Sequence, residues 1–395
     1  MNVLLGADSL LTRRSGIGRM TLEVAQALRR RDDLAGLRLL LHARAVRPDW
    51  LDALPSHVGA DRRVTPAARA LAALRARAGR VTLLRAWRDG QVRAALDGAA
   101  GALSAANGRA SVYHEPNMIA KPFSGPTVVT FNDLSWRHGG FHPADRLAWI
   151  ARGLPRTLRQ ATRYVAVSRF TAGCMTAELG IDPAVIDVAP LAPAALFRPM
   201  DAEGCRAVLA EHGLTDRAYV LSASTLEPRK NFDGLFRAWG RLPARLREAT
   251  PLVIVGGGGW GTVLASAEAE RARRDGSLRL LGHVPDEALA ALSTRCAAFA
   301  YVSHYEGFGL PVLEAMAAGA PVVAAATTAT GETAGDAARL VDPASDEDIA
   351  DALRAVLEDP AEAARLRGAS VARAAAFTWD RTADLLMASW RRASA

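Results

Sequence analysis

Short apolar runs alternate along this chain with stretches in which apolar residues recur every three or four positions. The first run covers residues 2–5. After a loop, apolar residues recur four positions apart at Met20, Val24 and Leu28, which is the spacing of one helix face. The start of the chain therefore predicts a strand, a loop and a helix.

The same alternation continues to the C-terminus in two series. Strand-like apolar runs of the first series lie at residues 37–41, 112–114, 127–131 and 163–167. Those of the second series lie at residues 219–223, 252–255, 278–281, 298–302 and 321–325. Helical stretches separate the runs, as is typical of doubly wound parallel sheets. The predicted fold class is α/β, with two Rossmann-like domains in tandem.

Prolines mark the boundary between the two series. Residues 190–199 include three prolines and are predicted to link a domain of residues 1–189 to a domain of residues 200–378. The tail, residues 379–395, has the pattern of a final amphipathic helix.

Charge is distributed unevenly between the two series. The net charge is +8, and among 49 basic residues only Lys121 and Lys230 are lysines. Residues 1–185 hold 27 basic and 14 acidic residues, whereas residues 186–395 hold 22 basic and 27 acidic ones. This asymmetry indicates two domains with different partners.

The N-terminus and the cysteines bear on the compartment. The first residues lack a basic stretch, and no run of 18 uncharged apolar residues occurs, so we expect neither a signal peptide nor a spanning helix. The three cysteines are far apart and form no zinc or disulfide pattern. A cytoplasmic chain is the expectation.

One segment has the composition of a helix that lies on a membrane surface. Residues 66–98 place leucines and Trp87 among many arginines, and basic amphipathic helices bind anionic lipid surfaces. An ordinary solvated helix face in an arginine-rich chain is the alternative. The arginines are dispersed over the whole chain and form no recognised module, so nucleic acid is not an expected partner.

The densest chemical signal is YEGFGLPVLEAMAAG, residues 305–319. Its glycines allow a ligand to approach the backbone, and Pro311 suits the first turn of a helix. Backbone N–H groups at that helix start would bind an anion, whereas the carboxylates of Glu306 and Glu314 would accept hydrogen bonds from sugar hydroxyls. The combination predicts a sugar-nucleotide site.

A second signal, TLEPRKN, covers residues 225–231 and directly follows an expected strand. It places Arg229 and Lys230 at the carboxyl end of that strand, where open α/β sheets bind ligands. Two adjacent cations suit a diphosphate, because Arg forks onto phosphate oxygens and Lys acts as a point charge. Taken alone, the pair would also fit an exposed loop at a helix start.

Together these segments resemble the retaining glycosyltransferases of family 4, the group 1 nucleotide-sugar transferases of the GT-B fold. The likeness extends to SGIGRMTLEVAQAL at 15–28, VYHEPN at 112–117, VVTFNDLSW at 128–136, AVSRFTAG at 166–173, LGHVPDEAL at 281–289 and AGDAARLVDP at 334–343. The motifs look like those of bacterial mannosyl- or rhamnosyltransferases of surface polysaccharide assembly. The resemblance implies two domains that face a cleft, with the C-terminal helix crossing back to the first domain.

The resemblance also implies that the second domain binds the donor. By that likeness, Glu306 would contact hydroxyls of the donor sugar, and Glu314 would bind the ribose hydroxyls. The backbone would support the sugar and the phosphates at four successive residues, Gly307, Phe308, Gly309 and Leu310.

Other donor contacts are implied for both domains. Arg229 and Lys230 would hold the diphosphate and stabilise it as it leaves. Four further positions match donor-binding segments of the family: backbone amides of Gly16 and Gly18 for the diphosphate, and His283 and Val284 for the base.

The first domain would bind the acceptor. Asp133 matches an acceptor-side polar residue of the family, and His114, at the end of an expected strand, is a candidate acceptor contact or part of a turn. The family commonly has His where this chain has Asn132, next to the reaction centre. Asn can form hydrogen bonds but cannot carry a proton at neutral pH, so its part in catalysis differs from that of His.

Two weaker patterns are also typical of other kinds of site, a dinucleotide-binding site and a metal site. Residues 256–261 contain G-x-G-x-x-G after a strand, but no acidic residue ends a strand about 20 residues later, which favours a turn near the nucleotide over a dehydrogenase site. The acidic triplet at 346–348 follows Pro-Ala-Ser and indicates a helix start rather than a metal site. We therefore expect no metal, and no cofactor besides the nucleotide-sugar substrate, with a GDP-sugar favoured.

The expected reaction transfers a hexose to a glycan without a metal and with retention of configuration. The expected hexose is mannose, and its donor is GDP-mannose. The acceptor would be lipid-linked or a polysaccharide, at the inner face of the cytoplasmic membrane, whose anionic surface the chain would contact peripherally. The alternatives are another donor (GDP-rhamnose or a UDP-sugar), a nucleotide-sugar epimerase, and a protein that binds the donor without transferring it.

Overall fold

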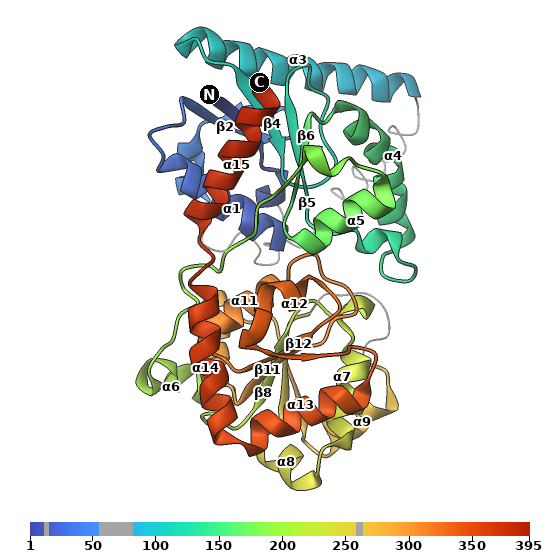
Figure 1. Ribbon diagram of the computed structural model, residues 1–395, viewed down its shortest axis with the longest axis vertical. Helices are drawn as coiled ribbons and strands as arrows, with labels where there is room; N and C mark the ends of the chain where they lie inside the picture. The colour runs from blue at the N-terminus through green and yellow to red at the C-terminus, as the bar shows by residue number, and fades with distance from the viewer. Residues whose placement is uncertain (12–15, 55–81, 258–263) are drawn as a thin grey trace, which may run out of the picture.

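The computed structural model describes residues 1–11, 16–54, 82–257 and 264–395, which form two α/β lobes (Figure 1). The first lobe contains a seven-stranded sheet of β1 (Asn2–Gly6), β2 (Gly36–Leu41), β3 (Arg44–Val46), β4 (Ser111–Glu115), β5 (Thr127–Phe131), β6 (Arg163–Ala166) and β7 (Ile186–Val188). The second contains a six-stranded sheet of β8 (Val220–Ala223), β9 (Leu252–Val255), β10 (Leu278–Gly282), β11 (Ala298–Tyr301), β12 (Val322–Ala325) and β13 (Arg339–Val341). The prediction of two Rossmann-like lobes is confirmed.

The two sheets share one topology. Their strand orders are β3-β2-β1-β4-β5-β6-β7 and β10-β9-β8-β11-β12-β13. All pairings are parallel except that of β3 with β2 at one edge. The order reverses between β1 and β4 and between β8 and β11, and ligands of such sheets bind outside the carboxyl ends of the strands at that point.

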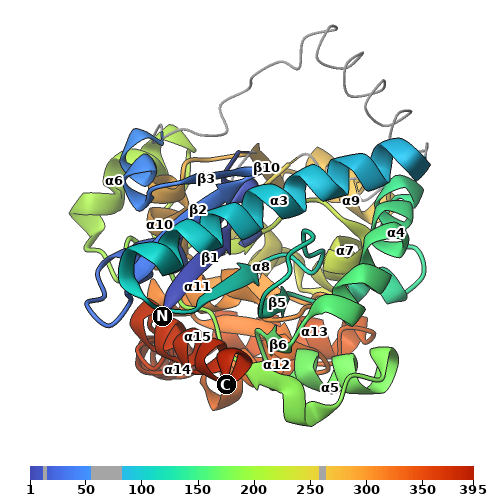
Figure 2. The same cartoon turned by 90° about the horizontal axis from the view of Figure 1, so that it is seen from above.

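Helices flank both sheets. In the first lobe they are α1 (Gly16–Arg29), α3 (Thr82–Asn107), α4 (Ala144–Gln160) and α5 (Arg169–Leu179). In the second lobe they are α6 (Ala202–Glu211), α7 (Phe232–Arg241), α8 (Ala244–Ala249), α9 (Ala267–Arg274), α10 (Asp286–Arg295), α11 (Leu310–Ala317), α12 (Ala329–Ala334), α13 (Asp346–Glu358) and α14 (Pro360–Ala374). Figure 2 shows α3 running across the first lobe. Of the arginine-rich segment predicted at 66–98, residues 66–81 lie outside the described residues.

Burial on both faces explains why the inner strands read as unbroken apolar runs. Every residue of β1, β4 and β5 is buried, as in parallel sheets that are covered on both sides. Three strands were not predicted: β3, β7 and β13. Each has only three residues and is partly exposed, so it carries no such run.

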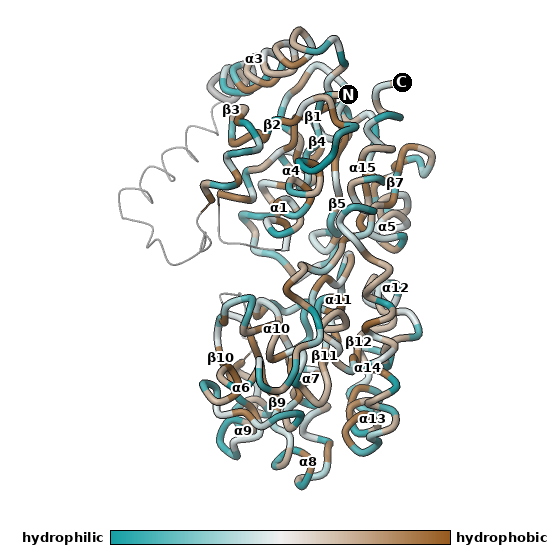
Figure 3. Tube along the Cα trace, turned by 90° about the vertical axis from the view of Figure 1, so that its left-hand side faces the viewer, coloured by the Kyte–Doolittle hydropathy of each residue, from teal (hydrophilic) through white to brown (hydrophobic). Residues whose placement is uncertain are grey.

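The last helix, α15 (Trp379–Ser394), follows the second lobe in sequence but packs on the first. Figure 3 shows it beside the upper lobe, whereas α14 lies beside the lower one. Two hydrogen bonds tie its start to the predicted linker, from Trp379 Nε1 to the Pro193 carbonyl (3.2 Å) and from Thr382 Oγ1 to the Pro190 carbonyl (2.6 Å). The expected crossing of the C-terminal helix is confirmed.

The position of α15 corrects the prediction for His114. Its imidazole is only 2% exposed, lies 5.4 Å from the Trp390 ring of α15, and forms a 2.8 Å hydrogen bond through Nε2 with Thr130 Oγ1. Burial lowers the pKa of His114 to about 3. His114 is therefore a neutral core residue beneath α15, and it does not reach an acceptor in the cleft.

Candidate active site

Loops at the carboxyl ends of strands from both lobes meet at Gly307. The Ser168 hydroxyl, after β6, donates a 2.6 Å hydrogen bond to the Gly307 carbonyl, and Thr171 Oγ1 donates a second of 3.0 Å. A Cβ on Gly307 would overlap the carbonyl oxygen of Asn132, after β5. Glycine is thus required here because the backbones of the two lobes touch.

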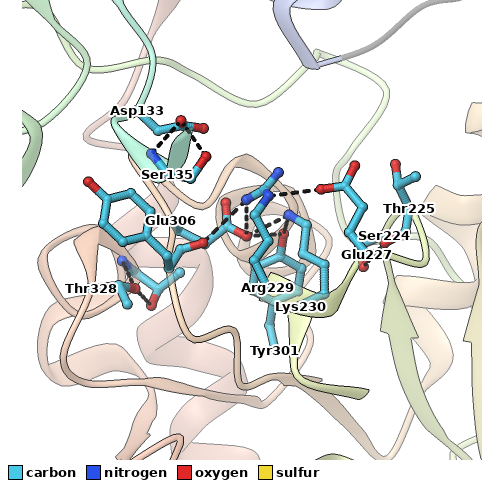
Figure 4. A network of polar contacts seen from close by, with 12 residues as sticks. Asp133, Ser135, Ser224, Thr225, Glu227, Arg229, Lys230, Tyr301, Glu306 and Thr328 are labelled. Carbon is cyan, nitrogen blue, oxygen red and sulfur yellow. Dashed lines mark hydrogen bonds and ion pairs between the residues drawn. The ribbon is translucent and has the colours of Figure 1, made fainter. Parts of the chain in front are cut away.

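The centre of the site is a buried cluster around the Glu306 carboxylate (Figure 4). Its Oε1 accepts hydrogen bonds from Lys230 Nζ at 2.5 Å, from Arg229 Nη1 at 3.0 Å and from the Tyr301 hydroxyl at 3.1 Å. Lys230 Nζ also donates to the Tyr301 hydroxyl at 2.7 Å. The two cations predicted for a diphosphate and the carboxylate predicted for a sugar therefore contact one another directly.

Electrostatics fix the charge of this cluster. Burial alone would raise the pKa of Glu306, but the charges of Lys230 and Arg229 outweigh it and hold that pKa at about 2. Burial, reinforced by the neighbouring Arg229, lowers the pKa of Lys230 despite its pairing with Glu306. The Glu306 carboxylate is therefore ionised throughout the neutral range.

Arg229 connects this cluster to neighbouring loops of the second lobe. Its Nε donates to Glu227 Oε2 at 2.8 Å, and its Nη1 also donates to the Tyr305 carbonyl at 3.2 Å. Although burial lowers the pKa of Arg229, the carboxylates of Glu306, Asp133 and Glu227 raise it above its usual value. Asp133, from the first lobe, therefore faces the second-lobe cations.

The first-lobe wall is held by a chain of hydrogen bonds. Asp133 Oδ1 accepts from the Ser135 backbone N–H (3.0 Å) and from its hydroxyl (2.7 Å), and Ser135 Oγ lies 2.7 Å from His142 Nε2. The Asn132 side-chain amide donates to the Pro116 carbonyl at 2.9 Å. This bond turns the Asn132 amide nitrogen toward its own lobe, whereas Asp133 faces the cleft.

The start of α11 presents backbone to the site. Gly309 precedes the helix with a φ of 87°, a left-handed conformation that favours glycine, and Leu310 is its first residue. The side chains of Phe308 and Leu310 are buried, and the Phe308 carbonyl accepts a 2.5 Å hydrogen bond from Thr333 Oγ1. Pro311 has no N–H, and the Val312 N–H already donates to the Gly309 carbonyl at 2.9 Å, so an anion at this helix start would meet the backbone N–H groups of Gly309 and Leu310.

Glu314, on α11, lies apart from the Glu306 cluster and pairs across the cleft. Arg19 of α1 forms an ion pair with it and donates to Asp286 Oδ1 at 2.6 Å. Gly16 and Gly18 begin the same helix α1, and His283 and Val284 lie just before Asp286. The structure thus gathers the predicted donor residues into two groups, one around Glu306 and one around Glu314.

Four residues of these groups escaped the sequence interpretation: Tyr301, Ser135, His142 and Arg19. Tyr301 lies one residue before the end of an expected strand, Ser135 lies within a quoted motif, and Arg19 directly follows Gly18. These positions in the sequence are the signals that could have indicated them as site residues. Their partners lie in other segments or the other lobe, so spacing did not reveal them.

The acidic triplet has the structural role that was predicted. Asp346, Glu347 and Asp348 form the first turn of α13, where the Ser345 hydroxyl accepts from the Asp348 N–H. Within the described ranges, no group of three or more His, Cys, Asp or Glu side chains is placed to hold a metal ion. Of the glycine-rich run at 256–261, positions 258–261 lie outside the described residues.

Comparison with known proteins agrees with this geometry. The family model for glycosyl transferases group 1 matches residues 208–371. O-antigen chain mannosyltransferase B of Escherichia coli is 35% identical over 272 residues, which is 68% of this chain and 71% of that protein. D-inositol 3-phosphate glycosyltransferase of Rhodococcus opacus is 34% identical over 278 residues, 68% of this chain and 61% of that protein.

Solved structures show the same fold over nearly the whole chain. HepE of Anabaena, solved with UDP-glucose, superposes with a TM-score of 0.70 at 18% identity and covers 99% of both chains. WaaG, a glycosyltransferase involved in lipopolysaccharide biosynthesis, superposes with a TM-score of 0.63 at 15% identity and covers 98% of both.

The contact at Gly307 predicts that Gly307→Ala opens the cleft. The added methyl would overlap Asn132 and Asp133, so we expect a loss of about 1–3 kcal/mol in the free energy of unfolding, as for other overpacked sites. Faster hydrogen exchange at residues 132–135 should accompany it. Gly240→Ala on α7 is the control, because its methyl would meet no atom within 4 Å. Equal stability and exchange in both variants would contradict the contact.

Proposed function

Because this chain belongs to the group 1 glycosyltransferases and has the GT-B fold, we propose that it transfers mannose from GDP-mannose to a glycan acceptor with retention of configuration. The observation that carries the proposal is the Glu306 cluster, in which Arg229 and Lys230 lie beside the start of α11. The names of its relatives, an O-antigen mannosyltransferase and the serotype-specific mannosyltransferase WbdA of Escherichia coli (32% identical over 194 residues, 48% of this chain and 24% of that protein), support surface polysaccharide as the product.

The donor diphosphate would compete with Glu306 for its two cations. When phosphate oxygens take the N–H groups of Arg229 and Lys230, the Glu306 carboxylate is released to accept hydrogen bonds from the sugar hydroxyls. Because these groups are buried, their charges act in a low-dielectric site and stabilise negative charge strongly. The cations and the helix start would then hold the diphosphate as it leaves.

In the proposed step, the bond between the sugar anomeric carbon and the diphosphate oxygen breaks while the acceptor oxygen attacks the same face. The leaving diphosphate oxygen takes the acceptor proton, so atoms and charge balance without a protein nucleophile. The protein supplies position and charge stabilisation. Asn132 and Asp133 are proposed to line the acceptor side of the reaction centre, where Asp133 is held by Ser135.

Two other readings are tested by nucleotide binding. HepE, the structural neighbour, was solved with UDP-glucose, which supports a nucleotide-sugar donor but also keeps UDP-sugars in view. Thermal-shift measurements with GDP, UDP, ADP and their sugars should give the largest stabilisation with GDP-mannose, since ligands that bind the native state raise Tm by mass action. Binding without slow donor hydrolysis or transfer would favour a protein that has lost catalysis, and stabilisation by none of these compounds would reject the donor site.

A surface of the first lobe supports peripheral binding to an anionic membrane. Helices α3 and α4 line an open groove that includes Arg93, Arg152 and Arg159, and the exposed side chains of Trp87 and Trp149 lie on the same two helices. Trp and Arg side chains together suit the lipid headgroup region. Among the described residues, no helix is both long and apolar enough to cross a bilayer. Contact through the arginine and tryptophan side chains of this surface is the proposed mode of binding.

Lys230→Ala is predicted to reduce turnover of the donor by about 100- to 1,000-fold with the fold intact, the usual loss when one charge-stabilising donor is removed. Steady-state transfer or donor hydrolysis measures it, with circular dichroism as the test of folding. Arg245→Ala is the control: it removes an exposed cation of the same lobe, on α8, outside the cleft. Near-normal turnover in Lys230→Ala would reject the diphosphate role.

The membrane surface predicts that Arg93→Gln/Arg152→Gln weakens binding to vesicles of anionic phosphatidylglycerol by roughly thirtyfold, since each basic residue near such a surface contributes about 1 kcal/mol. Vesicle cosedimentation measures the effect, and salt should diminish binding of the unmodified protein. Arg245→Gln/Arg273→Gln removes two exposed cations from the second lobe and should bind normally. Equal loss in both variants would indicate nonspecific attraction and contradict the assigned surface.

A further inference from the structure

One side chain of the first lobe reaches two carboxylates of the second. Arg19 projects from α1 and is only 17% exposed. One guanidinium nitrogen pairs with Glu314 Oε1 on α11 and the other donates to Asp286 Oδ1 on α10 at 2.6 Å. The guanidinium also lies 5.7 Å from the centre of the Phe197 ring. Arg19 therefore connects the two lobes at the side of the cleft away from Glu306.

Glu314 depends on this cation for its charge. Its side chain is only 5% exposed, and burial raises its pKa to about 7 even though Arg19 opposes the shift. The other charged groups that act on it, Asp286 on α10 and Glu23 on α1, raise the pKa further. Without Arg19, a carboxyl that is buried among like charges would be largely protonated at neutral pH.

Arg19 engages only one of the two carboxylate oxygens of Glu314. The bond from Arg19 goes to Oε1 of Glu314, so Oε2 can accept from a hydroxyl. We propose that Arg19 is a positioning residue for the donor nucleotide: from the first lobe it fixes the Glu314 carboxylate for the ribose hydroxyls, which couples closure of the cleft to nucleotide binding. This inference rests on the proposed function, in which Glu314 binds ribose.

The coupling has a measurable pH dependence. Ribose hydroxyls need the ionised carboxylate as an acceptor, so nucleotide affinity should rise with pH through the pKa of Glu314 and level off above it. Removing the cation raises that pKa, and an Arg beside a carboxylate commonly lowers it by 1–3. In Arg19→Met the midpoint of the affinity profile should therefore move upward by about 1 to 3 pH units, which lowers the affinity at pH 7 by about fivefold for a shift of one unit and by about 500-fold for a shift of three.

Isothermal titration calorimetry of the full chain between pH 6 and pH 9 tests this shift. GDP and UDP are first titrated into the unmodified protein, and the nucleotide that binds is then used for all variants. Arg29→Met is the control, because Arg29 lies on the same helix but pairs with Asp52, and both side chains are well exposed. Its profile should match the unmodified protein. Arg19→Lys keeps the charge without the fork, so its midpoint should lie between those of the unmodified protein and Arg19→Met.

Glu314→Gln separates the titration of Glu314 from that of the nucleotide phosphates. In this background the shift caused by Arg19→Met should disappear. If Arg19→Met alone fails to fold, the double variant is measured in its place, because it removes both partners of the buried pair. A normal profile in Arg19→Met, or an equal shift in the Glu314→Gln background, would overturn the proposal. If neither nucleotide binds the unmodified protein, the donor-site function itself fails instead.

Discussion

The site depends on the compensation of one buried carboxylate. Glu306 is 7% exposed and lies at the end of the β11 loop, where an unpaired ion would cost several kcal/mol. Two cations and a tyrosine hydroxyl converge on its Oε1, and the cations come from a single short turn, Pro228–Lys230. Each charge is tolerated in the interior because the others are present, so the geometry of the cluster is specified by its own electrostatics.

The topology of the second sheet brings these groups together. Arg229 and Lys230 follow β8, Glu306 follows β11, and these are the neighbouring strands where the order of the second sheet reverses. Asn231, with a φ of 58°, holds the turn by donating to the carbonyls of Val302 and Pro343. The position of the Glu306 cluster therefore follows from the parallel topology and from one turn that hydrogen bonds hold in place.

Apolar runs predicted ten of the thirteen strands of the described residues, and two motifs predicted Glu306, Glu314, Arg229 and Lys230 as candidate site residues. Both signals are local. The error at His114 was not local: α15, which covers it through Trp390, lies more than 260 residues later in the chain. Arg19 was missed for the same reason, since its partner Glu314 is 295 residues away and the pair exists only because the lobes approach each other. A residue's exposure is a property of the assembled fold, whereas periodicity reports only which face is apolar.

The two glutamates of the motif at residues 305–319 differ in pKa because their surroundings differ. Glu306 meets its counter-charges within its own lobe, and its pKa is about 2. Glu314 takes Arg19 from the opposite lobe, and its pKa is about 7. Opening the cleft would leave the first cluster intact but would remove the cation from the second. In the proposed donor site, the part around Glu306 is therefore held within one lobe, whereas the part at Glu314 depends on a contact between the two lobes.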